Sequence, residues 1–438
     1  MPLNLATIYS TLGNPNSLVP LGIKDVSNSL GITACSYVTG KEEGQDRFID
    51  EFGTQALWLF GIPLFKKIFN LTAFKAFNLD STVDARILKD KDVFEKIKQN
   101  APTEEIKQKL KDVEKHQKLF KNLVATKFVV ATALTVASYI GLTKIKQNYT
   151  EKKIRENLIK EHEKKQQLID QKNQQNEKKV EKSKAPNFKG FGAVVEEFAF
   201  SPVKNMYILD GFITGERLRD SRSAQELAGY AIKEGSYLFF MYYAGRKIQE
   251  WMEQAAKKNH NKSITLDSRV IEDLRLQKRF ENGSIQKSLE EFKKVENNKA
   301  ELYDFIINNP NNYIVRACKK SDIIARYDNT AKIDTRKYID LDEVKNTAKD
   351  IEELYSQYKS ALNKGETSEQ FFNGSKSMKG LKQLKRIAVL KNIGTGILAL
   401  GVVTPLIMLL KRLTDDAGKE FQTKKDIKEK LINEGVIS

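Results

Sequence analysis

The sequence predicts an all-α integral membrane protein, and two apolar runs in an otherwise polar chain are the main reason. Residues 392–410 contain no charged side chain, and residues 122–143 contain only Lys127. A helix rises about 1.5 Å per residue, so the run at 392–410 covers about 28 Å, close to the roughly 30 Å thickness of bilayer hydrocarbon. We therefore predict two transmembrane helices, at 122–143 and 392–410.

The run at residues 122–143 is slightly short for a span if Lys127 marks the end of its apolar part. A lysine near a helix terminus can extend its stem and place the ammonium at the membrane interface, so Lys127 is compatible with a span. The alternative for either run is a fully buried helix of a soluble bundle. Gly141 and Ser138 are compatible with both interpretations.

Two shorter apolar stretches, residues 56–65 and 235–245, are too short for ordinary spans. Lengths of this kind are typical of core helices or of re-entrant and interfacial segments. The second stretch contains several aromatic residues, which are enriched at membrane interfaces. We predict two short interfacial or re-entrant helices and keep a protein core as the alternative.

Composition and charge limit the partners. The chain has 438 residues, 40% of them apolar, which allows two or three domains with packed cores. A formal net charge of +17 indicates an anionic partner. Zinc-finger, KH and RRM signatures are absent, and much of the lysine excess flanks apolar runs, so we expect an anionic lipid membrane rather than nucleic acid. A homo-oligomer or an unknown protein partner stays open.

The remaining segments complete the predicted domain order. Residues 1–36 are expected to be loop-rich, without the basic and apolar regions of a cleavable signal peptide. Residues 144–185 contain neither glycine nor proline and predict a long charged helix or linker after the first span. Residues 300–380 predict a soluble helical insertion, with a helix at 342–362 that ends before Gly365. Residues 381–438 comprise a basic segment, the second span and a polar tail.

Similar residues recur in two parts of the chain, which predicts an internal duplication of residues 37–143 and 186–299. The recurrences fall at separations of 175, 180 and 183 positions: Gly40, Arg47 and Glu51 with Gly215, Arg222 and Glu226; Lys66 and Lys67 with Arg246 and Lys247; Asp84 and Arg86 with Asp267 and Arg269. The separation grows in one direction, as small insertions in one copy would cause. Repeated units of membrane proteins commonly pack about a pseudo-two-fold axis. On this hypothesis Arg47 with Glu51, and their counterparts, are ion pairs on equivalent helices.

The sequence offers no catalytic, cofactor-binding or metal-binding constellation. His116, His162 and His260 lie in lysine- or glutamine-rich contexts without other ligands at metal-binding spacing. Cys35 and Cys318 are too far apart in sequence for a CxxC site and favour a reducing compartment. Walker-type glycine loops and nucleophile elbows are absent. We therefore expect a protein that is not an enzyme and uses no cofactor.

One group of ionisable residues beside the aromatic stretch has two interpretations. Glu226, Lys233 and Glu234 share one helical face. Ionisable groups at membrane depth commonly mark a transport pathway. The simpler interpretation is a water-facing side of an interfacial helix.

These observations lead to a functional hypothesis with two alternatives. The main hypothesis is a non-enzymatic membrane-anchored scaffold or membrane-shaping protein that interacts with anionic lipid. The alternatives are a transporter or pore component built from a duplicated helical unit, and a soluble, basic, nucleic-acid-binding helical protein. Lysine and arginine residues are more numerous in residues 376–391 than in 411–419, which predicts that the main soluble portion is cytoplasmic.

Overall fold

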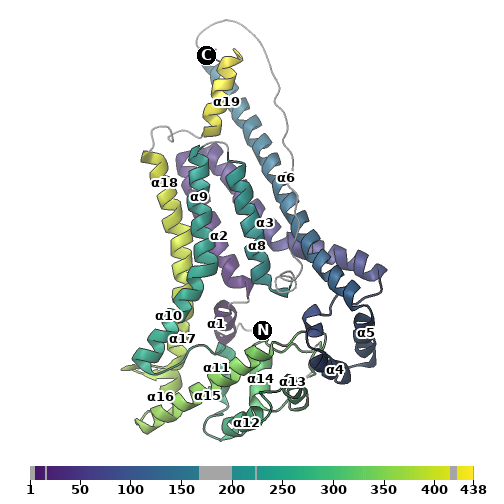
Figure 1. Cartoon of the computed structure of the whole chain (residues 1–438). Coiled ribbons are helices and arrows are strands. Elements are labelled where there is room, and N and C mark those ends of the chain that lie inside the picture. The colour runs from purple at the N-terminus through teal and green to yellow at the C-terminus, as the bar shows by residue number, and fades with distance from the viewer. Residues whose placement is uncertain are drawn as a thin grey trace.

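The computed structural model confirms the all-α class. It describes residues 5–14, 17–166, 200–221, 224–328, 330, 332–414 and 422–437. Apart from a hairpin of β1 (Gly374–Ser375) and β2 (Met378–Lys379) and one isolated bridge, the regular structure of these residues is helical. The helices form an upright bundle above a cluster of shorter helices (Figure 1).

The upright bundle contains the long apolar helices of the described chain. Its segments are α2 (Leu18–Thr39), α3 (Lys41–Phe69) with the π-helix η1 (Asn70–Phe74), α6 (Gln117–Gln166), α8 (Pro202–Arg219), α9 (Ala224–Leu238) with the π-helix η3 (Phe239–Ala244) and α10 (Gly245–His260), and α17 (Leu381–Leu398) with the π-helix η4 (Ala399–Val403) and α18 (Thr404–Thr414). Short links join α2 to α3 and α8 to α9, so each pair is a helical hairpin.

Three helices of the described chain are long and apolar enough to cross a membrane: Lys41–Phe74, Gln117–Glu163 and Leu381–Lys411. The second and third contain the two predicted spans. Their apolar surfaces are not enclosed by the protein, since at most 39% of the residues in any of the three apolar windows are buried. Leu398, Leu406 and Leu410 are examples, each exposed by 46% or more.

The first of these helices corrects the prediction for residues 56–65. This stretch is the middle of a continuous helix from Lys41 through Phe74, not a short re-entrant or interfacial helix. Residues 235–245 likewise lie inside the continuous α9–η3–α10 segment. Charged residues on the adjoining helical turns end both apolar runs in the sequence. The structure buries several of these charged side chains inside the bundle, where they form ion pairs with side chains of other helices.

The N-terminal segment is helical and not loop-rich as predicted. Helix α1 (Leu5–Gly13) precedes α2, which begins where the Ser17 hydroxyl accepts a hydrogen bond from the backbone N–H of Val19. Gly31 sits in the middle of α2 because η4 packs there: a Cβ at this position would lie 2.1 Å from the carbonyl oxygen of Gly401. Gly31 is thus a point of close contact between two helices.

The two hairpins are followed by the same sequence of elements. In each, the second helix contains or ends in a π-helix, then comes an Asp-x-Arg turn, then short helices of the lower cluster, and finally a long apolar helix. Helix α6 packs against α3 of its own hairpin and α8 of the other. The α17–η4–α18 segment packs against α9 and α10 of its own hairpin and α2 of the other.

The lower cluster, here called the basal domain, has one core formed by both parts of the chain. It contains the 3₁₀ helix η2 (Ala85–Leu88), α4 (Lys91–Gln99), α5 (Glu104–Lys115), α11 (Ser268–Leu276), α12 (Ser284–Lys293), α13 (Lys299–Asn308), α14 (Tyr313–Lys320), α15 (Leu341–Asn363) and α16 (Ser368–Asn373). The predicted helix at 342–362 is confirmed as α15, and its apolar stripe is buried. Residues 300–380 share this core with residues 74–124 rather than forming a separate insertion.

Three Asp-x-Arg turns support the basal domain. In each, the aspartate accepts a hydrogen bond from the backbone N–H of the arginine two positions later, and the guanidinium donates at least two hydrogen bonds to the same carboxylate. The turns are at Asp84–Arg86, Asp267–Arg269 and Asp334–Arg336. The sequence comparison identified the first two, and the third has the same geometry.

Helix α6 extends beyond the bundle, as predicted for the charged segment after the first span. It continues to Gln166, and the rest of the predicted 144–185 helix lies outside the described residues. Near its end, Ile154 and Leu158 pack against Ile427 and Leu431 of α19 (Gln422–Asn433). The polar tail therefore contains a helix that docks on α6.

Candidate functional site

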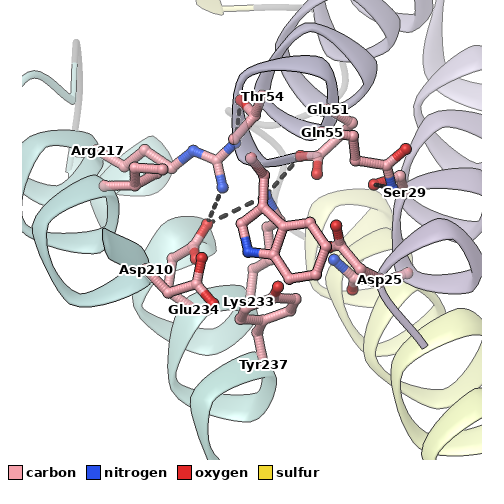
Figure 2. A pocket seen from close by; sticks show the side chains of 13 residues that line it. Asp25, Ser29, Glu51, Thr54, Gln55, Asp210, Arg217, Lys233, Glu234 and Tyr237 are labelled. Carbon is pink, nitrogen blue, oxygen red and sulfur yellow. Dashed lines mark hydrogen bonds and ion pairs between the residues drawn. The ribbon is translucent and has the colours of Figure 1, made fainter. Parts of the chain in front are cut away.

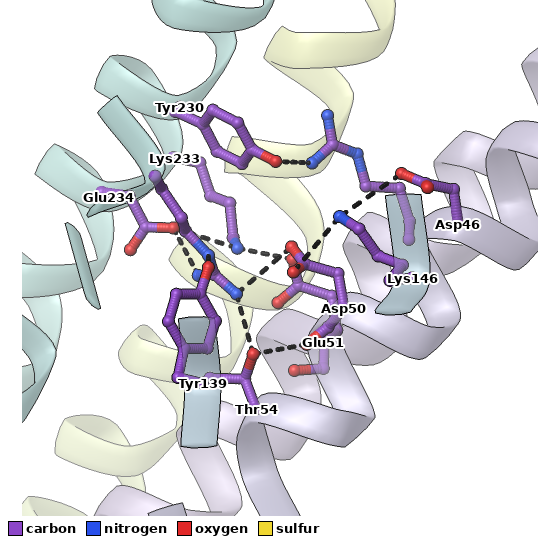
Figure 3. A network of polar contacts seen from close by, with 12 residues as sticks. Asp46, Asp50, Glu51, Thr54, Tyr139, Lys146, Tyr230, Lys233 and Glu234 are labelled. Atoms are coloured by element: carbon purple, nitrogen blue, oxygen red, sulfur yellow. Dashed lines mark hydrogen bonds and ion pairs between the residues drawn. The ribbon is translucent and has the colours of Figure 1, made fainter. Parts of the chain in front are cut away.

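The interior of the bundle contains a dense network of charged side chains. Asp46, Arg47, Asp50 and Glu51 project from α3, Lys146 from α6, Arg217 from α8, and Lys233 and Glu234 from α9; each of these residues is exposed by 8% or less. Figure 3 shows most of them converging between the hairpins. Burying a charged side chain costs free energy unless an opposite charge or a hydrogen-bond partner compensates it. Each of these side chains therefore requires a partner in the bundle interior.

Each cation of this network has acidic or hydroxyl partners on other helices. Lys146 Nζ lies 3.6 Å from Asp46 Oδ2 and 3.4 Å from Asp50 Oδ1. Arg217 contacts Asp50 at 3.3 Å and Glu234 at 2.6 Å. The network therefore links α3, α6, α8 and α9 through side chains that are far apart in the sequence.

The remaining two cations connect the hairpins directly. Lys233 on α9 pairs with Glu51 on α3, and its ammonium is also 3.1 Å from Glu234. Arg47 on α3 donates a 2.9 Å hydrogen bond to the Tyr230 hydroxyl on α9, with its guanidinium over the same ring. Polar contacts therefore join the second helices of the two hairpins.

A small cavity lies beside this network (Figure 2). Its volume of about 20 Å³ is enough for one water molecule or a small ion. Asp25, Asn28, Ser29, Glu51, Thr54, Gln55, Trp58, Asp210, Ile213, Arg217, Lys233, Glu234 and Tyr237 line it. The two hairpins contribute comparable numbers of these side chains, so the cavity lies at the interface between them.

Acidic residues of the two hairpins, separated by 183–185 positions in the sequence, line this cavity. Asp25 of α2 and Asp210 of α8 both line it and are separated by 185 positions; Glu51 of α3 and Glu234 of α9 are separated by 183. The N-cap serines of α2 and α8, Ser17 and Ser201, are 184 positions apart. Each hairpin therefore places one aspartate and one glutamate at the same interior cavity.

Two cavity carboxylates differ from the rest of the network. Among the residues that the structure describes, neither Asp25 nor Asp210 has a lysine, arginine or histidine nitrogen within 4 Å. Asp210 instead accepts a hydrogen bond from the Tyr242 hydroxyl, and Tyr237 lines the cavity together with Asp25. Their charges are therefore less completely compensated than those of Asp50, Glu51 and Glu234.

The cavity also contains unsatisfied polar atoms. Asn28 is 1% exposed and its Oδ1 has no hydrogen-bond partner in the described structure; Trp58 is 2% exposed and its Nε1–H has none either. An unpaired buried polar group costs about 1–3 kcal/mol. A donor and an acceptor left unpaired at one cavity are the expected signature of a site that takes a polar guest.

The structure places the residues singled out from the sequence as follows. Lys233 and Glu234 are in the bundle interior rather than on a water-facing side of an interfacial helix. Arg222 and the side chain of Glu226 lie outside the described residues. The predicted correspondence of Gly40 with Gly215, at a separation of 175 positions, is wrong. Gly40 links α2 and α3, whereas Gly215 lies within α8.

Several residues of the site were missed in the sequence. Asp25, Asp50 and Asp210 are single acidic residues in apolar or mixed surroundings, and nothing local distinguishes them from surface carboxylates. A signal existed in the alignment of Ile49-Asp50-Glu51 with Ile232-Lys233-Glu234 at 183 positions, the same separation as the Asp-x-Arg turns. A comparison anchored on those turns would have identified Glu51 and Glu234 as counterparts.

Other candidate chemistry is sparse. Within the described residues there is no group of three or more histidine, cysteine, aspartate and glutamate side chains placed to hold a metal ion. Cys35 and Cys318 are both free thiols. Cys318 is buried in the basal core, and this burial raises the pKa of its thiol to about 12, so it is a poor nucleophile.

Comparison of the chain with known protein families, with curated proteins and with solved structures found no match.

Proposed function

We propose that this chain is an integral membrane transporter or pore component built from two equivalent helical units around one interior cavity. The observation that carries the proposal is that both hairpins contribute a buried aspartate and a buried glutamate to the same cavity. Ionisable groups at membrane depth are expensive and are usually retained where they bind or conduct. Transport sites commonly lie at the interface between repeated units.

Membrane insertion is supported by the apolar surfaces of the three long helices. Large apolar side chains on them are exposed: Leu59, Phe60, Leu64, Val129, Leu134, Leu398, Val402, Val403, Leu406, Ile407 and Leu410. An apolar surface of this extent favours hydrocarbon over water as its surroundings. In this arrangement the basal domain lies at one membrane surface, which we infer to be cytoplasmic from the basic residues before the last span.

The duplication is supported by element order and by equivalent residues. Each unit consists of a hairpin, an Asp-x-Arg turn, basal helices and a long apolar helix, and each long helix packs against its own hairpin and the other. The three helices of each unit run in the same directions as their counterparts in the other, as in parallel repeats related by an axis along the membrane normal. We infer that the cavity lies near this axis.

The proposal is tested by flux measurements on protein reconstituted into liposomes. We expect solute or ion flux from vesicles that contain the wild-type chain, measured with entrapped pH-sensitive and ion-sensitive dyes. A Glu51→Gln, Glu234→Gln double variant should lose at least tenfold in rate, because it removes one carboxylate from each unit. Asp92→Asn, at an exposed position of α4, is the matched control and should retain the wild-type rate. Vesicles that pass no tested ion or solute would contradict the proposal.

A second candidate is the non-enzymatic membrane scaffold that interacts with anionic lipid. The specific observation in its favour is that the cations of the interior network are paired with carboxylates or a tyrosine, as a purely structural network would be. The net charge of +17 also suits an anionic lipid surface. A scaffold predicts binding to phosphatidylserine-containing vesicles together with no flux in either the wild type or the double variant.

A further inference from the structure

We propose that the interior cavity binds a small monovalent cation, held by Asp25 of one helical unit and Asp210 of the other. The inference rests on the proposed transport function and names the chemical class that the cavity takes. Two aspartates alone would not define a site. The unpartnered atoms of Asn28 and Trp58 supply the independent observation that a guest belongs there.

The charge of the cavity lining favours a cation. The lining contains the carboxylates of Asp25, Glu51, Asp210 and Glu234 and the cations of Arg217 and Lys233, which leaves a formal charge of −2. Arg217 and Lys233 are engaged by Glu234 and Glu51. The uncompensated charge therefore falls on Asp25 and Asp210, and a buried charge of this kind is stabilised by a counter-ion.

The neighbouring charged groups do not supply that counter-ion. Lys24 is adjacent to Asp25 in sequence, but its ammonium points to the Asn392 side chain of α17 at 3.4 Å. Lys146 is paired with Asp46 and Asp50, and Arg47 with the Tyr230 hydroxyl. Asp210 itself accepts a hydrogen bond from the Tyr242 hydroxyl, which is an uncharged donor.

The type and size of the donors favour a hard monovalent ion. The carboxylates of Asp25 and Asp210 and the unpaired Asn28 Oδ1 are oxygen ligands, which alkali and alkaline-earth ions prefer. Divalent ions usually require more carboxylates than the two uncompensated ones present here. The cavity of about 20 Å³ has room for one small ion, and the Trp58 N–H could bind a water molecule that accompanies it.

The first test measures thermal unfolding of the purified full chain in detergent. Tryptophan fluorescence is recorded in NaCl, in KCl and in choline chloride at equal ionic strength. We expect a saturable rise of the unfolding temperature in NaCl or KCl but not in choline chloride, since a ligand that binds only the folded state stabilises it. Radioactive sodium binding by equilibrium dialysis supplies the direct readout.

Variants connect the effect to the cavity. Asp25→Asn and Asp210→Asn should each abolish the cation-dependent shift and raise the unfolding temperature in choline chloride, because each removes an uncompensated charge. Asn28→Ala, which leaves both carboxylates in place, should weaken sodium binding about tenfold and supplies the test if an aspartate variant does not fold. The exposed control Asp92→Asn should leave the shift unchanged.

The outcomes separate this inference from the proposed function. Flux in liposomes without any sodium- or potassium-dependent stabilisation or binding would overturn the cation site while leaving the transport function intact. An unfolding temperature that depends on pH but not on either ion would also overturn it, because a proton would then neutralise the aspartates. Cation binding without flux would support the site and contradict the transport function.

Discussion

Lys233 illustrates how much the bundle depends on individual buried charges. Its ammonium is shared between Glu51 on α3 and Glu234 on its own helix, and the residue is 1% exposed. A buried ion pair adds little net stability compared with an apolar pair of similar volume, but removing one partner leaves the other charged and unpaired. The cost of such a change therefore depends on what is left behind.

Replacement of Lys233 by methionine should destabilise the folded chain by about 3–5 kcal/mol, since Glu51 loses its cation in the bundle interior. Equilibrium unfolding in mixed detergent micelles measures this change. A Glu51→Gln, Lys233→Met double variant should recover part of the loss because the stranded charge is gone. Lys247→Met, in an exposed pair with Glu250, is the control and should have no measurable effect. A single variant as stable as the control would show that Lys233 is not needed to neutralise Glu51.

The sequence identified only part of this site. Lys233 and Glu234 were recognisable because their spacing puts both on one helical face beside an apolar stretch. Asp25 and Asp210 were not, because a single aspartate in a mixed segment has no periodicity and its burial depends on which helix lies opposite. Their common location became visible only when α2 and α8 were placed around one cavity.

At the level of helices, close packing explains the small residues of α2. Gly31 lies against η4, where a Cβ would be 2.1 Å from the Gly401 carbonyl oxygen and 2.8 Å from Pro405 Cγ. Gly22, in the same helix, has nothing within 4 Å of an added Cβ. The two glycines therefore differ in role although both interrupt the same apolar segment, and only the first is required by packing.

This difference gives a matched pair of substitutions. Gly31→Ala should destabilise the chain by about 1–3 kcal/mol because α2 and η4 must separate to accept the methyl group. Gly22→Ala should be neutral or stabilise by up to about 1 kcal/mol, since alanine favours a helix more than glycine does. Thermal unfolding followed by circular dichroism compares the two in one detergent. Equal effects of both substitutions would mean that the contact with η4 is not close.

The sequence predicted helices best where one periodic pattern decided the outcome. The stripe of α15 and the long uncharged runs in α6 and α17–α18 are of this kind, and the structure contains all three. The extents of α3 and α9–η3–α10 were not predictable in the same way. Charged residues on one face lower the mean hydropathy of these helices, and only the neighbouring helices show that this face is internal.

For the molecule as a whole, the apolar outer surface of the bundle is compatible with a membrane as its surroundings. The bundle interior holds a charged network beside a buried apolar cluster, and much of the surface of the long helices is apolar, which is unusual for a helical bundle in water. The basal domain has an ordinary apolar core. The two parts of one chain are therefore suited to different solvents.

An alkaline carbonate wash of membranes from expressing cells tests this arrangement. The full chain should remain in the membrane pellet, because extraction would expose the apolar faces of three long helices to water. A high-salt wash of the same membranes controls for electrostatic attachment through the basic surface. Release of the chain by either treatment would favour the soluble, basic, nucleic-acid-binding alternative.

The sequence by itself determined the helical class, two of the three long apolar helices and the absence of a recognisable catalytic motif. These properties follow from local composition and periodicity, which each segment carries without reference to the others. Tertiary structure alone decided that α2 is a packed helix, that Asp25 and Asp210 meet at one cavity, and that Lys233 has an acidic partner on α3. Burial and pairing are relations between segments distant in the chain, and a single sequence does not contain them in readable form.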